Sequence, residues 1–129
     1  MILFFDRNIG TGIPKALQLL RMRDSEIQYH QAFFSMATED DRRLERVGEW
    51  GWIVIGQDYK FHLLPNELYS IKQHSVGAFY LAGAELPAWE TMRIFARAYD
   101  KIIDAVERTS LPFVFWIDRN GRLTQLSLP

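Results

Sequence analysis

Short, fully apolar runs recur along this chain, and two of them run almost directly into an aspartate. The runs lie at 2–5, 52–56, 76–81 and 113–117. Asp6 follows the first run at once, and Asp58 follows the second after one polar residue. Apolar runs of this length without polar alternation are typical of strands buried on both faces, as in parallel sheets. We therefore expect the core to be built around such strands.

Segments with helical signals separate these runs. A helix is predicted to start at Thr11 or Gly12, another after Thr38 as its N-cap, and a third at 66–73. The longest is predicted to start at Pro87. Its expected core-facing stripe is Trp89, Met92, Phe95, Ala96, Tyr99, Ile102, Ile103 and Val106.

A short strand at 27–29 and a C-terminal hairpin complete the expected elements. Asn120-Gly121 is a hairpin signal, so 123–128 should pair back antiparallel. Alternating strands and helices indicate an α/β fold. We expect a three-layer α/β/α sandwich, with a mostly parallel sheet of about five strands plus the hairpin.

Length and composition narrow the class of protein. A chain of 129 residues is expected to form one domain, 1–129. The formal net charge is −1, so a nucleic-acid site would have to be a local patch. There is no cysteine, which excludes disulfides, thiolate zinc sites and cysteine nucleophiles. No apolar run approaches the roughly 20 residues that span a bilayer, and no secretory signal is recognisable, so we expect a cytoplasmic protein with no membrane partner.

Asp6 and Asp58 form the strongest candidate site. The carboxyl ends of parallel strands share one edge of a sheet, where ligands bind in such folds. If the two strands are neighbours, the two carboxylates converge, repel and favour a bound divalent cation. Such a cation could activate water for attack on a phosphodiester. The alternative is that each aspartate only caps a turn or a helix. The three histidines, His30, His62 and His74, show no metal-ligand spacing.

Four stretches of the chain resemble parts of PIN-like domains. FFDRNIGTGIPKAL looks like their opening strand, aspartate and helix, and GWIVIGQDYKF looks like a later strand with its trailing aspartate. TEDDRRLERVGEWGW is similar to the helix that carries a further acid. PFVFWIDRNGRL resembles the closing strand and hairpin of a compact subgroup related to VapC-type toxins. The order and spacing match along nearly the whole chain.

The resemblance implies a metal-dependent endoribonuclease that uses Mg²⁺ or Mn²⁺. Residue by residue, Asp6 and Asp58 match metal-binding aspartates. Asp40 matches the third acid, with its neighbour Asp41 as the alternative, although both could simply favour a helix N-terminus. Arg43 stands where relatives often have an aromatic residue. Because the subgroup is related to toxins of toxin–antitoxin pairs, the expected partners are RNA, an antitoxin protein and a second copy in a homodimer.

Further charged residues are candidates for contacts with substrate or with a second ion. Lys60 could touch a phosphate as a point charge, and Arg7 and Arg43 could add to a positive rim. The alternative is a solvated surface with locally paired charges. Glu67 could help to bind a second ion through water, or it could be a first-turn acid of the helix behind Pro65.

Two other functions compete with the nuclease. The first is a PIN-like binding or interaction module without catalysis, which the neutral net charge and the missing fourth acid favour. The second is a receiver-type signalling domain, which would need an acidic pair after the first strand. Asp6 is followed instead by Arg7, and the last strand ends in Ile117-Asp118, with no lysine after it.

Overall fold

The computed structural model describes residues 1–57 and 65–129. Two predicted site residues, Asp58 and Lys60, belong to 58–64 and lie outside the described residues. Within the described part of the chain, no helix is both long and apolar enough to cross a bilayer.

A single six-stranded sheet runs through the molecule in the order β2-β1-β3-β4-β5-β6. The strands are β1 (Ile2–Phe5), β2 (Glu26–Tyr29), β3 (Ile53–Gln57), β4 (Gly77–Leu81), β5 (Phe113–Ile117) and β6 (Leu123–Leu126). All neighbouring pairs are parallel except β5 and β6, which form the C-terminal hairpin. The mostly parallel sheet with an antiparallel closing strand confirms the expected fold class.

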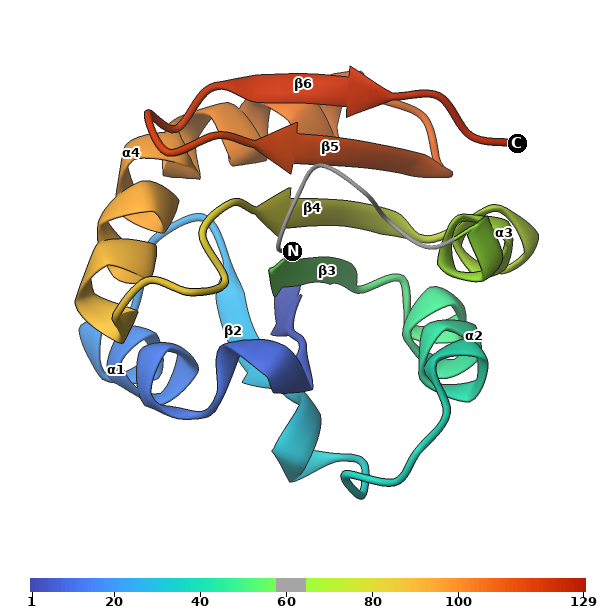
Figure 1. The fold of residues 1–129 in the computed structure, drawn as a ribbon, viewed down its shortest axis with the longest axis horizontal. Coiled ribbons are helices and arrows are strands. Elements are labelled where there is room, and N and C mark those ends of the chain that lie inside the picture. The colour runs from blue at the N-terminus through green and yellow to red at the C-terminus, as the bar shows by residue number, and fades with distance from the viewer. Residues whose placement is uncertain (58–64) are drawn as a thin grey trace.

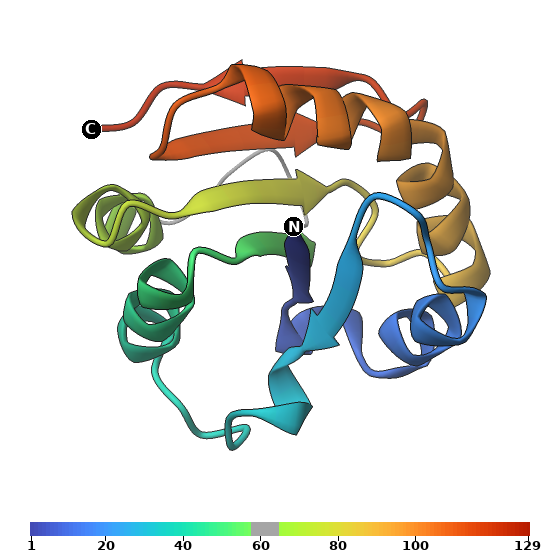
Figure 2. The same ribbon diagram turned by 180° about the vertical axis from the view of Figure 1, so that it is seen from behind.

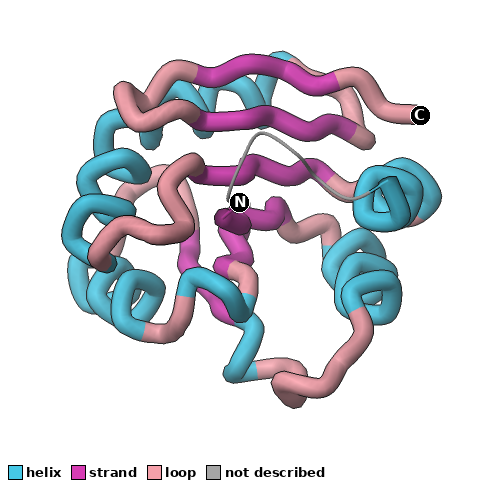
Figure 3. Tube along the Cα trace, in the orientation of Figure 1, coloured by secondary structure: helices cyan, strands magenta, loops and turns pink. Residues whose placement is uncertain are grey.

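Helices cover both faces of this sheet (Figures 1 and 2). They are α1 (Gly12–Leu20), α2 (Asp40–Trp50), α3 (Pro65–Gln73) and α4 (Ala88–Arg108), with short 3-10 turns η1 (Arg7–Ile9) and η2 (His30–Ala32). In Figure 3, α1 and α4 lie on one side of the magenta strands, and α2 and α3 lie on the other. The result is the expected three-layer α/β/α arrangement.

Alternation along the strands sorts side chains between the two helical layers. Leu3 and Phe5 pack in the core under α1 and α4, whereas Phe4 packs in the core under α2 and α3. Since successive side chains of a strand point to opposite faces, the residue after Phe5 points to the side of Phe4. Asp6 is therefore directed toward α2 and α3.

The stripe expected for the longest helix is partly wrong. Trp89 is 71% exposed and Ala96 is also exposed, whereas Ile94 and Ala98 are buried against the sheet. Apolar spacing on a helix with many apolar residues is compatible with more than one stripe, and only packing on the sheet selects among them.

The start of α2 also differs from the prediction. Glu39 occupies the N-cap position with no side-chain cap bond, and α2 begins at Asp40 rather than directly after Thr38. The hydroxyl of Thr38 instead lies 3.2 Å from that of Ser35, while its carbonyl accepts a bond from Arg7. The helix ends at Gly51, which has φ +71°.

Candidate active site

Asp6 lies where the two neighbouring strands β1 and β3 end. Its backbone N–H donates to the carbonyl of Ile55 at 2.9 Å. Two residues later, the amide Nδ2 of Asn8 donates to the carbonyl of Gln57 at 2.7 Å. The expected adjacency of the two strands is thus confirmed. Asp58 directly follows Gln57 but is not described, so the convergence of its carboxylate with that of Asp6 stays a prediction.

A fully buried arginine stands beside Asp6. The Nη1 atom of Arg43 is 3.2 Å from Oδ1 of Asp6 and 2.7 Å from Oδ1 of Asp40. Its Nη2 atom is 3.9 Å from Oε1 of Glu67. Arg43 projects inward because α2 turns the side that carries Leu44 and Val47 toward the sheet. One guanidinium therefore lies among acids that come from the end of β1, from α2 and from α3.

A second guanidinium holds Asp40 from the outside. Nη2 of Arg7 is 2.8 Å from Oδ1 of Asp40, and its Nη1 donates to the carbonyl oxygens of Thr38 at 2.6 Å and Met36 at 3.1 Å. Arg7 thereby ties the segment before α2 to the turn after β1. The side chain of Arg7 is 26% exposed.

Asp40 and Asp41 are adjacent in the chain but point to different partners. Asp40 shares Arg43 with Asp6, as described above. Oδ1 of Asp41 instead accepts a bond from the hydroxyl of Ser70 at 2.7 Å and lies 3.0 Å from Nε2 of His74, both in the region of α3. Of the two candidates for the third acid, Asp40 is the one on the side of Asp6.

Glu67 is fixed by a tyrosine of the sheet. The hydroxyl of Tyr80, in β4, donates to Oε1 of Glu67 at 3.0 Å. The ring of Tyr80 lies against Gly56 of β3, where an added Cβ would sit 2.7 Å from the tyrosine Cε1 atom. A glycine at this position of β3 therefore provides the room that lets the Tyr80 ring reach Glu67.

Burial and neighbouring charges act in opposite directions on the ionisable groups. Burial alone would lower the pKa of the Arg43 guanidinium, but the carboxylates of Asp6 and Asp40 outweigh it, so its pKa is raised and it stays charged. Burial raises the pKa of Glu67, and the Tyr80 hydroxyl and Arg43 offset only part of this effect. Burial, and next the charge of Glu67, raises the pKa of Tyr80 well above its usual range.

The oxygen atoms of this group suit a hard divalent cation. Contacts among the described residues use only Oδ1 of Asp6, Oδ1 of Asp40 and Oε1 of Glu67. Within residues 1–57 and 65–129, the second oxygen of each carboxylate has no such contact. Three carboxylates also face the two guanidiniums of Arg7 and Arg43, which leaves net negative charge. Oxygen donors of this kind suit Mg²⁺ or Mn²⁺, but the carboxylates of Asp6, Asp40 and Glu67 do not all place a ligand atom within 4.8 Å of one another.

A different group of residues has the tighter geometry for a metal. Among groups of three or more acidic or histidine residues in the described part of the chain, only the group of Asp41, Glu45 and His74 has ligand atoms that all lie within 4.8 Å of one another. Asp41 and Glu45 are exposed, and His74 is partly buried. The sequence did not indicate this group, because His74 lies far along the chain from the two acids. Asp41 already has Ser70 and His74 as partners, so its charge is stabilised without an ion.

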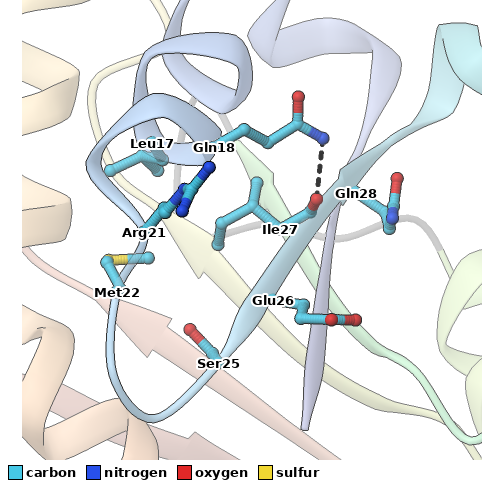
Figure 4. Close-up of a pocket in the computed structure, with 8 residues that line it drawn as sticks. All are labelled: Leu17, Gln18, Arg21, Met22, Ser25, Glu26, Ile27 and Gln28. Carbon is cyan, nitrogen blue, oxygen red and sulfur yellow. Dashed lines mark hydrogen bonds between the residues drawn. The ribbon is translucent and has the colours of Figure 1, made fainter.

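A hollow elsewhere on the surface does not coincide with the acids. A cavity of about 390 Å³ lies between the C-terminal part of α1 and the start of β2 (Figure 4). Across it, Nε2 of Gln18 donates to the carbonyl of Ile27 at 2.8 Å. Because it borders the amino end of β2, it lies at the sheet edge opposite to the one that usually binds ligands. We therefore place the candidate active site at Asp6.

Two other features of the site differ from the sequence interpretation. Arg43 was expected to contact substrate, but its side chain is fully buried and engaged with acids. Direct contact with RNA therefore does not fit its position, and we assign it to holding the carboxylates. Tyr80 was expected only as part of a buried strand. A buried tyrosine hydroxyl needs a hydrogen-bond partner, which was the available signal that it would meet a polar group.

A comparison with protein families matches residues 1–83 to a family described as PIN like domain. This match covers more than half of the chain, and it includes Asp6, Asp40, Asp58 and Glu67. The chain therefore belongs to the PIN-like domain family, which points to a nuclease-type superfamily. No curated protein and no solved structure matches the chain. The VapC-type subgroup, an antitoxin partner and a homodimer stay predictions.

Proposed function

We propose that this chain is a metal-dependent ribonuclease in which Asp6, Asp40 and Asp58 hold Mg²⁺ or Mn²⁺. The observation that carries the proposal is the buried carboxylate of Asp6, at the carboxyl end of β1, in a PIN-like domain. An acid that is 5% exposed at a sheet edge is costly unless it is paired or bound, and here Arg43 and the backbone N–H of Arg7 engage only Oδ1 of Asp6. Asp58 completes the proposed ligand set, and Lys60 is proposed to contact the phosphate backbone.

The residues around the acids would act as positioning groups. Arg43 fixes one oxygen of Asp6 and one of Asp40, and thereby sets where their remaining oxygens point. Arg7 fixes Asp40 from the solvent side. Tyr80 holds Glu67, which is proposed to assist a second ion through water. A bound divalent cation would supply activation of water and neutralisation of charge on the phosphodiester.

A binding module without catalysis is the second candidate function, and Arg43 is the observation that favours it. The guanidinium already pairs with Asp6 and Asp40, so these acids are stabilised without any ion. In that case the chain would bind its partner equally well with and without metal. Both candidates predict the same fold, and cation binding at Asp6 separates them.

The test compares Mn²⁺ binding by calorimetry in the wild type, Asp6→Asn and His74→Gln. We expect Asp6→Asn to weaken Mn²⁺ binding by at least ~10-fold and to abolish Mn²⁺-dependent cleavage of a fluorogenic RNA. His74→Gln is the matched control, because it alters the exposed group of Asp41, Glu45 and His74 and leaves Asp6 untouched. It should bind Mn²⁺ like the wild type.

Two outcomes would contradict the proposal. Equal Mn²⁺ affinity of the wild type and Asp6→Asn would mean that the cation does not bind at Asp6. Loss of binding only in His74→Gln would place the cation at the exposed group instead. Circular dichroism and thermal unfolding of each variant serve as the control that its fold is intact.

A further inference from the structure

One exposed face of α2 carries two arginines and a tryptophan in a row. Arg42, Arg46 and Trp50 are spaced by four residues, so they lie on the same side of the helix. All three are exposed, and Trp50 keeps 41% of its surface accessible. A helix rises about 1.5 Å per residue, so the row is about 12 Å long.

Two acids of α2 lie on a different side of the helix. Asp41 and Glu45 lie toward α3, where Asp41 contacts Ser70 and His74. Arg42 and Arg46 instead border a groove of about 430 Å³, whose other lining residues are Phe34, Ala37, Thr38 and Glu39. Among the described residues, Arg42 forms no ion pair, and Arg46 has one exposed contact, 3.4 Å from Glu49. The charge near this groove is therefore mainly positive, with Glu39 the acid that lines it.

Aromatic rings support one another at the Trp50 end of the row. The ring of Trp50 stacks on Phe34 with a centroid distance of 5.9 Å, and lies 4.6 Å from the ring of Trp52. Phe33, which is 46% exposed, packs 5.8 Å from Trp50. Two partly exposed rings are thus held in place by the rings beside them. Exposed, preorganised rings next to arginines are the combination that binds single-stranded nucleic acid through stacking and phosphate contacts.

The groove reaches the acidic centre at the N-terminal end of α2. Thr38 and Glu39 line it and immediately precede Asp40. Arg7 connects the two places, because it bonds both the carbonyl of Thr38 and the carboxylate of Asp40. A strand that lies along the groove would therefore arrive beside Asp40, which shares Arg43 with Asp6.

We propose that Arg42, Arg46, Trp50 and Phe33 form a binding track for single-stranded RNA that leads into the acidic centre. This inference rests on the proposed function for the identity of the strand as RNA, and it adds where the strand lies. Two guanidiniums in a groove favour a polyanion over an apolar helix or peptide, and the flat rings favour unpaired bases over a duplex.

The test measures binding of a short fluorescent single-stranded RNA by anisotropy, in EDTA, so that no cleavage occurs. The variants are Trp50→Leu and the double substitution Arg42→Gln/Arg46→Gln. We expect Trp50→Leu to weaken binding by roughly 5- to 150-fold, the effect of losing one stacked base. The double variant should weaken binding and reduce the slope of log affinity against log salt by about one for each arginine.

The helix α4 offers matched controls. Trp89 is 71% exposed, and Arg93 and Arg97 are exposed at the same spacing of four. Trp89→Leu and Arg93→Gln/Arg97→Gln repeat the chemical changes on the opposite face of the sheet, and both should bind RNA like the wild type. Circular dichroism identifies any variant that is not folded, and the arginine variants test the track even if Trp50→Leu unfolds.

Some outcomes separate this inference from the proposed function. If the α2 variants bind RNA no more weakly than the α4 variants, the track is wrong, even if Mn²⁺-dependent cleavage by the wild type supports the nuclease. A second outcome combines two results: only the α2 variants bind RNA more weakly, and the wild type binds RNA but does not cleave it. That outcome would support the track and contradict the nuclease. An acidic peptide that binds more tightly than RNA, with the same dependence on Trp50, would assign the surface to a protein partner and overturn the inference.

Discussion

Two groups of charged residues flank α2, and they differ in how deeply their members are buried. The inner group contains the buried Asp6 and Arg43, although Asp40 at its edge is about as exposed as Asp41 in the outer group. On the inner side, Asp6 and Asp40 surround the fully buried Arg43. On the outer side, Asp41, Glu45 and His74 lie close together, with both acids exposed. A charge in water costs little, whereas a buried charge must be paired. The comparison teaches that the ion pairs of the inner group contribute strongly to the stability of the fold, whereas those of the outer group contribute little.

The largest expected effect follows from removal of Arg43. Arg43→Met keeps much of the side-chain volume but leaves Asp6 as a buried carboxylate without its cation, and we expect a loss of about 3–5 kcal/mol in the free energy of unfolding. Urea denaturation measures it. Arg42→Met, one residue away on the exposed side, is the control and should change stability by less than about 0.5 kcal/mol. Equal losses in the free energy of unfolding for the two substitutions would contradict the difference between the two sides.

A smaller effect is expected at the edge of the inner group. Tyr80→Phe removes the hydroxyl that donates to Glu67 and leaves a largely buried carboxylate without that donor. We expect a loss of about 1–3 kcal/mol, together with a further rise in the pKa of Glu67. The control is Tyr69→Phe, whose ring is 63% exposed and which should be neutral. A shared midpoint of urea unfolding for both variants would contradict the role given to Tyr80.

The smallest effect is expected on the outer side. The Ser70 hydroxyl, and next the contact with His74, lowers the pKa of Asp41. Because the folded pKa is depressed, this stabilisation is present above the ordinary value of about 3.9 and is lost as the pH falls through the lowered folded pKa. Asp41→Asn should therefore cost less than about 1 kcal/mol at pH 7, and the cost should vanish on acidification. A stability difference that persists once Asp41 is protonated in both the folded and the unfolded state would show that a neutral contact matters more.

Much of the architecture was accessible from the sequence alone. Runs such as Ile2–Phe5 and Phe113–Ile117 contain no polar residue, so only a sheet covered on both faces could accommodate them. The hairpin at Asn120-Gly121 followed from local turn chemistry, since Oδ1 of Asp118 accepts the backbone N–H groups of Asn120 and Arg122. These features depend on neighbours in the chain, which is why pattern and propensity were sufficient.

The candidate site was accessible only in part. The position of Asp6 at the end of a buried strand was predicted, and the structure meets the condition that its strand neighbours the one that precedes Asp58. The different partners of Asp40 and Asp41, and the burial of Arg43, depended on how α2 is rotated against the sheet. A helix turns by about 100° per residue, so adjacent acids face different partners, and the sequence does not state that rotation.

By itself, the sequence determined the succession of strands and helices, the buried strand that ends in Asp6, and membership of the PIN-like family. The tertiary structure alone decided that one arginine lies among Asp6, Asp40 and Glu67, and that Tyr80 crosses Gly56 to reach Glu67. The physical reason is the separation along the chain of the residues that produce each feature. Strand and turn signals arise from residues close in the chain, whereas ion pairing in a buried centre depends on the packing of β1, α2, α3 and β4, which meet only after folding.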